Sequence, residues 1–81
     1  MLFGKKRYTA IDIGSHNITV ADIKQEGNKQ LRVLNVAQKS VPYDTLQNGI
    51  IKDTSVIANR LQEIFAETGI KPGTILTTVS N

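Results

Sequence analysis

The stretch AIDIGSHNITVADI, residues 10–23, decides the fold. It contains two runs rich in isoleucine and valine, separated by a glycine and three polar residues, which is typical of two strands joined by a short turn. The first run carries Asp12 between Ile11 and Ile13. A carboxylate among buried isoleucines costs free energy unless it is paired. The partner of Asp12 is therefore either a structural hydrogen bond or a ligand, such as a metal ion with a phosphate.

Three strands are predicted in the first half of the chain, at residues 8–13, 18–24 and 31–37. The second and third are separated by QEGNK, where Gly27 and Asn28 both tolerate a positive φ. Connections this short favour an antiparallel meander.

The third predicted strand has apolar residues at both odd and even positions, which indicates that each of its two faces is partly buried. These residues are Leu31, Val33, Leu34 and Val36. A long connection follows, in which Pro42 breaks the strand and Asn48-Gly49 marks a turn. Ile50 and Ile51 are expected to pack against the body of the protein rather than face water.

The segment DTSVIANRLQEIFAETG, residues 53–69, predicts a helix. Asp53 or Thr54 can cap its start, Gly69 stands where a C-terminal glycine belongs, and Pro72 stops any continuation. Arg60 is expected to be exposed, as is Gln62. Four apolar residues recur at helical spacing and are expected to face the sheet. They are Ile57, Leu61, Ile64 and Phe65.

Residues 74–80 form a last β-branched strand, so the predicted order is β-β-β-α-β. A helix between the third and fourth strands is long enough for a right-handed crossover, which makes the last strand parallel to a neighbour. We expect the first strand in the middle of the sheet, flanked by the second and the last, with the helix on one face. Because the chain stops at an apolar strand, we expect a piece of a larger domain; the alternative is a complete small α+β domain.

Composition excludes several classes of protein. The chain has 81 residues, no cysteine and a net charge of +3. Disulfides, thiolate zinc sites and thiol catalysis are therefore excluded. No run of about 18 apolar residues is present, so no membrane span is expected. The basic residues at positions 5–7 are followed by no apolar run and interleave with no aromatic residues, so neither a secretory signal nor nucleic-acid binding is predicted.

The turn after Asp12 has the chemistry of a phosphate loop. Gly14 allows a tight turn and close approach of a ligand. The backbone N–H groups of Ser15, His16 and Asn17 can point together and attract an anion. Asp12 can hold Mg²⁺, directly or through water. The alternative is a hairpin in which Asp12 and Ser15 bond only to the turn; His16 is more simply a turn residue than a metal ligand, since the chain has no second histidine.

These residues resemble the first phosphate loop of the actin, hexokinase and heat-shock-chaperone ATPase superfamily. The basic opening MLFGKKR and the segment NGIIKDTSVIANRLQEIF are similar to those of its PilM-like and FtsA-like members. The resemblance implies an α/β fold: residues 1–7 would be a basic leader, and residues 8–81 the amino-terminal part of an actin-like subdomain 1A. That part is the β-β-β-α-β opening of a ribonuclease-H-like domain. The second phosphate loop and the adenosine-binding glycines would lie beyond Asn81.

The resemblance also implies a function. Asp12 would be the magnesium-linked aspartate, and Gly14, Ser15, His16 and Asn17 would be the phosphate turn. The parent protein would bind ATP and Mg²⁺ with weak ATPase activity at most, at the cytoplasmic face of the inner membrane. It would recruit the cytoplasmic tail of a PilN-like membrane protein, with other pilus assembly proteins.

Two alternatives stay open for the parent protein: an FtsA-like tether of the division ring, and a sugar or acetate kinase. A third alternative is that the chain is a stand-alone interaction module without nucleotide. This chain alone is expected to be no enzyme, to bind Mg-ATP weakly and to self-associate.

Overall fold

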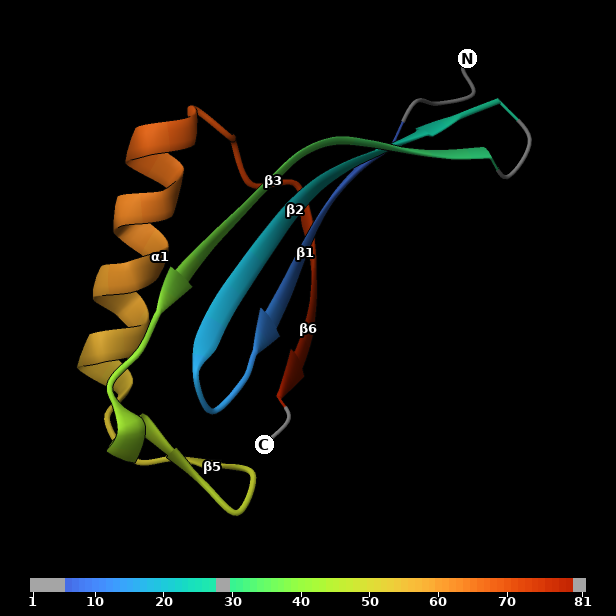
Figure 1. The fold of residues 1–81 in the computed structure, drawn as a ribbon. Helices are drawn as coiled ribbons and strands as arrows, with labels where there is room; N and C mark the ends of the chain where they lie inside the picture. Colours follow the sequence, from blue (N-terminus) through green and yellow to red (C-terminus); the bar gives the residue numbers. More distant parts are fainter. Residues whose placement is uncertain (1–5, 28–29, 80–81) are drawn as a thin grey trace.

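The computed structural model describes residues 6–27 and 30–79, and it is a mixed α/β structure, mostly a sheet with one helix (Figure 1). Residues 1–5, Asn28 and Ser80, which belong to the predicted leader, turn and last strand, lie outside the described residues. The main elements are β1 (Arg7–Ile13), β2 (Asn17–Glu26), β3 (Gln30–Ser40), α1 (Thr54–Thr68) and β6 (Thr74–Val79). Between β3 and α1 lie the 3-10 turn η1 (Tyr43–Thr45), β4 (Leu46–Gln47) and β5 (Ile50–Ile51).

The four long strands form one sheet in the order β3-β2-β1-β6. β1 pairs antiparallel with β2, with Ile13 opposite Ile18, and β2 pairs antiparallel with β3. β6 runs parallel to the other side of β1, with Tyr8 opposite Thr74. The prediction of a central first strand and a parallel last strand is confirmed.

Arg7 is the first residue of β1, although the resemblance placed it in the basic leader. Its guanidinium donates to both carboxylate oxygens of Asp22, with 2.6 Å from Nη2 to Oδ2 and 3.3 Å from Nε to Oδ1. Asp22 is a buried carboxylate on β2. A buried charge needs such a partner, so Arg7 has a structural role.

The ends of α1 confirm the predicted caps. The Asp53 carboxylate accepts from the backbone N–H groups of Ser55 at 3.1 Å and Val56 at 3.4 Å. Gly69 ends the helix with φ at 75°, and its N–H donates to the carbonyl of Phe65. Such a left-handed residue is tolerated best by glycine.

The core lies between α1 and one face of the sheet, as predicted. Its buried members are Ile11, Ile13, Ile18, Val20, Val41, Ile57, Ile64 and Ile70. Leu61 and Phe65 pack against this cluster but are only partly buried. The expectation that Arg60 is exposed is wrong: it is half-buried, because its Nε donates to the Ser40 carbonyl at 2.9 Å. Gln62 is exposed as expected.

A bulge in β3 corrects the prediction that this strand is covered on each face. The register shifts between Asp22, which pairs with Asn35, and Ile23, which pairs with Val33, so Leu34 is an extra residue. The bulge reverses the parity of the strand. Leu31, Val33 and Val36 therefore lie on the face opposite α1, where they are 65%, 59% and 56% exposed, and the extra residue Leu34 is 42% exposed.

The connection between β3 and α1 forms a small hairpin. The sequence predicted its turn but not its two short strands. β4 and β5 pair antiparallel around Asn48 and Gly49, whose φ angles are 54° and 75°. Positive φ at both positions is the signature of the Asn-Gly turn. Ile51 is half-buried as expected, but Ile50 is 62% exposed, so the expectation for Ile50 is wrong.

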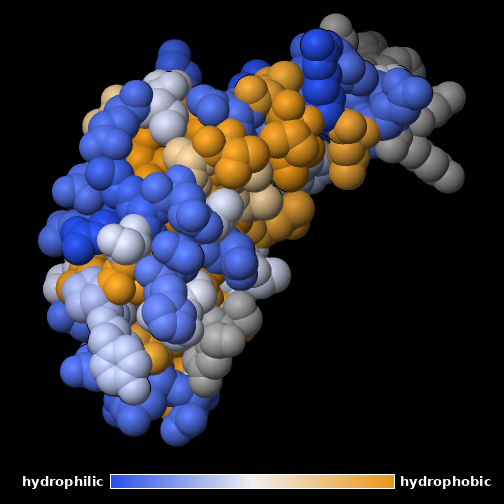
Figure 2. All heavy atoms as spheres, in the orientation of Figure 1, coloured by the Kyte–Doolittle hydropathy of each residue, from blue (hydrophilic) through white to orange (hydrophobic). Residues whose placement is uncertain are grey.

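Two surfaces of the sheet are open. Figure 2 shows hydrophobic side chains gathered over the half of the sheet where β2 and β3 run toward their hairpin. At the other side of the sheet, all six residues of β6 are exposed. α1 covers β2 and β3 (Figure 1). β6 stands at one end of the strand order, and no strand in the described part of the chain pairs with its outer edge.

Candidate functional site

The five predicted site residues lie together at the tip of the β1–β2 hairpin. Asp12 is near the carboxyl end of β1, and β2 begins at Asn17. The turn is closed by a 2.9 Å hydrogen bond from the Gly14 N–H to the Asn17 carbonyl. A shallow hollow of about 230 Å³ is lined by these five residues together with one further residue of β2 and one of β3. Its lining is Asp12, Gly14, Ser15, His16, Asn17, Thr19 and Gln38.

The side chain of Asp12 is exposed, although its neighbours in sequence are buried. Ile11 and Ile13 are buried toward α1, whereas the Asp12 side chain lies on the opposite, exposed face. Its Oδ1 accepts a 2.6 Å hydrogen bond from the hydroxyl of Thr78 on β6. No hydrogen bond reaches Oδ2 from the described residues. Asp12 therefore has a structural partner and keeps one oxygen available to a ligand.

The turn also leaves backbone donors unused. The N–H groups of Ser15 and His16 make no hydrogen bond within residues 6–27 and 30–79. The Gly14 N–H is used by the hairpin itself, and Gly14 does not have a positive φ. Two of the three N–H groups of the predicted anion-attracting nest, at Ser15 and His16, are therefore without a hydrogen bond among the described residues.

His16 has the contacts of a turn residue. Its ring Nδ1 lies 3.0 Å from the Ser15 hydroxyl, its carbonyl accepts from the Val41 N–H at 2.9 Å, and the residue is exposed. No group of three potential metal ligands occurs among the described residues. A metal at this turn would therefore depend on Asp12 and water, as a hydrated Mg²⁺ does.

The charge of the hollow limits what can bind there. Of the described residues that line it, Asp12 is the one with a formal charge, and none is lysine or arginine. A phosphate beside an unpaired carboxylate is repelled unless a cation lies between them. The site therefore fits a metal–phosphate pair better than a free anion.

A second hollow of about 220 Å³ lies between the turn and the β4–β5 hairpin. Its lining is Ser15, His16, Tyr43, Asp44, Leu46, Gln47 and Asn48. The hydrogen bond from Val41 to His16 anchors this connection beside the turn. The sequence did not predict that the β4–β5 hairpin lines a hollow beside the turn, although Asn48-Gly49 marked the turn of that hairpin.

Another hollow, of about 440 Å³, is on the open face near the start of β1. It is lined by Tyr8, Ile23, Gln25, Leu31 and Leu76. The Tyr8 hydroxyl donates to Oε1 of Gln25 at 3.2 Å. The lining carries no charge, so this hollow belongs to the apolar face and not to the Asp12 site.

Comparisons with protein-family models, curated protein sequences and solved structures each gave no match. Among the described residues, no helix is both long and apolar enough to cross a membrane.

Proposed function

We propose that this chain is the amino-terminal part of an actin-like, ATP-binding scaffold for type IV pilus assembly. The observation that carries the proposal is the position of Asp12 at the tip of the β1–β2 hairpin. Asp12, which has a free oxygen, lines one hollow with Ser15 and His16, which have unused N–H groups. Carboxylate oxygens suit Mg²⁺, and paired N–H groups suit a phosphate.

The arrangement of the strands supports the same proposal. The order β3-β2-β1-β6, with one helix between β3 and β6, is the arrangement expected for the opening of a ribonuclease-H-like domain. Ligands of sheets with parallel strands favour the carboxyl ends of the strands. Asp12 and Thr78 lie at that end of the parallel pair β1 and β6.

The remaining parts of the proposal follow from the resemblance to PilM-like proteins. The parent protein acts at the cytoplasmic face of the inner membrane and recruits the cytoplasmic tail of a PilN-like protein. ATP and Mg²⁺ tune this assembly. An FtsA-like division-ring tether would use the same loop.

An interaction module without nucleotide is the second candidate function. It is favoured by the open apolar face, where Leu31, Val33 and Val36 are more than half exposed. An exposed apolar surface of this kind is typical of a site of contact with another protein.

A residue-resolved titration separates the two candidates. Mg²⁺ and ATP at millimolar concentration should shift the amide NMR signals of Ser15, His16 and Asn17, and ATP without Mg²⁺ should shift them far less. Because the hollow is shallow, we expect weak binding and no clear rise in melting temperature. Asp12→Asn should abolish the Mg²⁺ dependence. The matched control is Asp44→Asn, an exposed acid in the neighbouring hollow, which should leave it intact.

Shifts that do not depend on Mg²⁺, or that persist in Asp12→Asn, would refute the metal–phosphate assignment. Signals of the turn that stay unmoved, while a partner tail shifts those of the apolar face, would favour the interaction module.

A further inference from the structure

Four polar residues form a row across the four-stranded sheet, one from each strand. Asp12 of β1 lies opposite Thr78 of β6 and, on its other side, opposite Thr19 of β2. Thr19 in turn lies opposite Gln38 of β3. Residues paired across strands share a face of the sheet, so the row lies on the face opposite α1. Asp12, Thr19 and Gln38 line the same hollow there.

Two hydrogen bonds orient this row and leave its middle open. The Thr78 hydroxyl donates to Oδ1 of Asp12 at 2.6 Å, and Nε2 of Gln38 donates to the hydroxyl oxygen of Thr19 at 3.0 Å. No side-chain hydrogen bond joins Asp12 to Thr19 in the described part of the chain. Each of the three residues that line the hollow therefore keeps an oxygen with a free lone pair. These oxygens are Oδ2 of Asp12, Oγ1 of Thr19 and Oε1 of Gln38.

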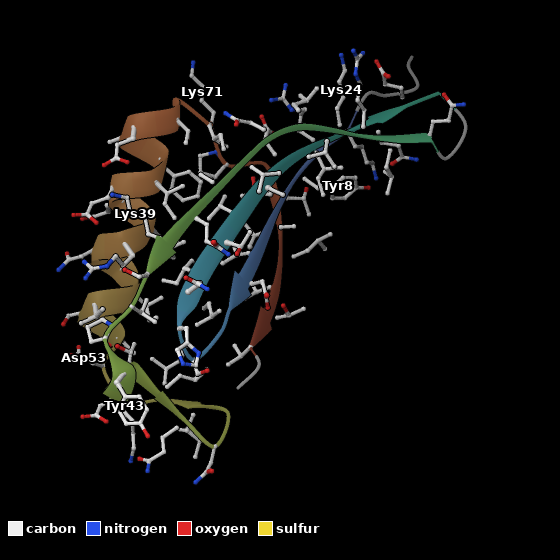
Figure 3. The ribbon with its side chains drawn as sticks, in the orientation of Figure 1. Tyr8, Lys24, Lys39, Tyr43, Asp53 and Lys71 are labelled. Atoms are coloured by element: carbon white, nitrogen blue, oxygen red, sulfur yellow. The ribbon has the colours of Figure 1, made fainter. Side chains whose placement is uncertain are left out.

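No positively charged side chain stands in this row to compete for these oxygens. Side chains alternate between the two faces along a strand, so Lys39, next to Gln38, points toward α1 (Figure 3). Its Nζ lies 2.9 Å from Oε2 of Glu67 and 3.8 Å from Oε1 of Glu63, both on α1. Asp12 makes no ion pair with any described residue. The hollow thus combines one unpaired carboxylate with two neutral acceptors.

We propose that Thr19 and Gln38 hold the water shell of the divalent cation that Asp12 binds. The inference rests on the proposed function, because it extends the same metal–phosphate site from the turn onto β2 and β3. Mg²⁺ keeps several of its waters in protein sites, and waters bound to a cation donate hydrogen bonds to acceptor oxygens. One carboxylate with neutral oxygens beside it suits such a hydrated ion. The N–H groups of Ser15 and His16 stay available to the phosphate.

Gln38 has two roles in this site. Its Nε2 fixes the hydroxyl of Thr19, and its Oε1 accepts from a metal-bound water. Gln38→Leu removes both roles, and Thr19→Val removes one acceptor while it keeps the shape of the side chain. Gln38→Glu places a second carboxylate at the hollow, and a carboxylate attracts a divalent cation more strongly than an amide does. The proposal therefore predicts a gain of affinity as well as losses.

Amide NMR with Mn²⁺ as the probe tests the proposal in the absence of nucleotide. Mn²⁺ takes the same oxygen ligands as Mg²⁺, and its unpaired electrons broaden the signals of nearby nuclei. In the parent chain, the side-chain NH₂ signals of Gln38 and the backbone amides of Asp12 and Thr19 should broaden first. The readout for the variants is the Mn²⁺ concentration that halves the Asp12 amide signal. Gln38→Leu and Thr19→Val should each raise it about two- to tenfold, and Gln38→Glu should lower it about three- to tenfold.

A matched control separates a specific site from general attraction by charge. Gln47→Glu adds the same charge beside the turn, at an exposed position of the neighbouring hollow. Because Gln47 is not in the row and its charge is screened by solvent, this variant should change the Mn²⁺ concentration by less than about twofold. Gln38 is exposed, so far-UV circular dichroism should show an unchanged fold in both of its variants.

The outcomes distinguish this inference from the proposed function. If Asp12→Asn abolished the broadening while the Gln38 and Thr19 variants matched the parent chain, the inference would be overturned and the proposed function would stand. Equal gains in Gln38→Glu and Gln47→Glu would also overturn it. Broadening spread evenly over the parent chain would do the same. If Mg²⁺ and ATP then left the signals of the turn unmoved, the metal–phosphate assignment would be refuted as well.

Discussion

The hydroxyl of Thr78 donates a 2.6 Å hydrogen bond to Oδ1 of Asp12, across 66 positions of sequence. The two residues face each other because β6 runs parallel to β1 with Asp12 opposite Thr78. The bond fixes one oxygen of the carboxylate, and no hydrogen bond from the described residues reaches the other. Strand β6 is therefore part of the candidate site, although the loop that suggested the site lies wholly between β1 and β2.

Replacing Thr78 by valine tests this relationship. Thr78→Val keeps the side chain's size and removes the donor, so Asp12 should lose its fixed orientation. Since the bond is exposed, the free energy of unfolding should change by less than about 1.5 kcal/mol. We expect the Mg²⁺-dependent NMR shifts of Ser15 and His16 to weaken. Thr74→Val makes the same change on the same face of β6, opposite Tyr8 and not Asp12, and should leave them unchanged. Equal titrations in both variants would show that Thr78 does not position Asp12.

Replacing a side chain of α1 by alanine should lower the free energy of unfolding more, the more deeply that side chain is buried. Ile64 is 1% exposed, so Ile64→Ala should lower the free energy of unfolding by about 2–5 kcal/mol. Leu61 is only partly buried, and Leu61→Ala should cost less. Gln62→Ala, at an exposed position, should stay within about 0.5 kcal/mol of the parent chain. Urea unfolding measures all three. A larger loss for Leu61→Ala than for Ile64→Ala would mean that the helix is rotated from the position described.

Gly73 holds the start of β6 against β1. A Cβ built there would lie 2.5 Å from the carbonyl oxygen of Arg7, and the Gly73 N–H donates to the hydroxyl of buried Thr9 at 2.8 Å. Gly73→Ala should push the strands apart and cost roughly 1–3 kcal/mol in thermal or urea unfolding. Lys71→Ala, two residues earlier and exposed, provides the control. If Gly73→Ala matched that control, the backbone contact would be looser than described.

Local patterns predicted the helix and the turns because each depends on residues that are close together in the sequence. The caps Asp53 and Gly69 bracket α1, and the Asn48-Gly49 turn marks the β4–β5 hairpin. The bulge at Leu34 could not be predicted in the same way. It depends on which residues of β2 face β3, and so the parity of β3 by itself gave the wrong face assignment.

The same distinction applies to the candidate site. Asp12, Gly14, Ser15, His16 and Asn17 are near neighbours in sequence, so the turn alone brings them into one hollow. The contribution of Thr78 arises only from the register between β1 and β6. No local pattern encodes a register across 66 positions, which is why the donor to Asp12 was not predicted.

The pH dependence of stability should reveal the cap of α1. Hydrogen bonds from the Ser55 side chain, and then from the Val56 N–H, lower the pKa of Asp53 below its ordinary value of 3.8. Because the folded pKa is the lower one, the stability from this cap is present in full above the ordinary value and is lost as the pH falls through the folded pKa. The melting temperature should therefore fall more between neutral pH and about pH 2 in the parent chain than in Asp53→Asn, which caps without titrating. Asp44→Asn removes an exposed acid that accepts no hydrogen bond among the described residues, and it should keep the parent's pH dependence. If Asp53→Asn kept that dependence too, the cap would contribute nothing to the acid sensitivity of the fold.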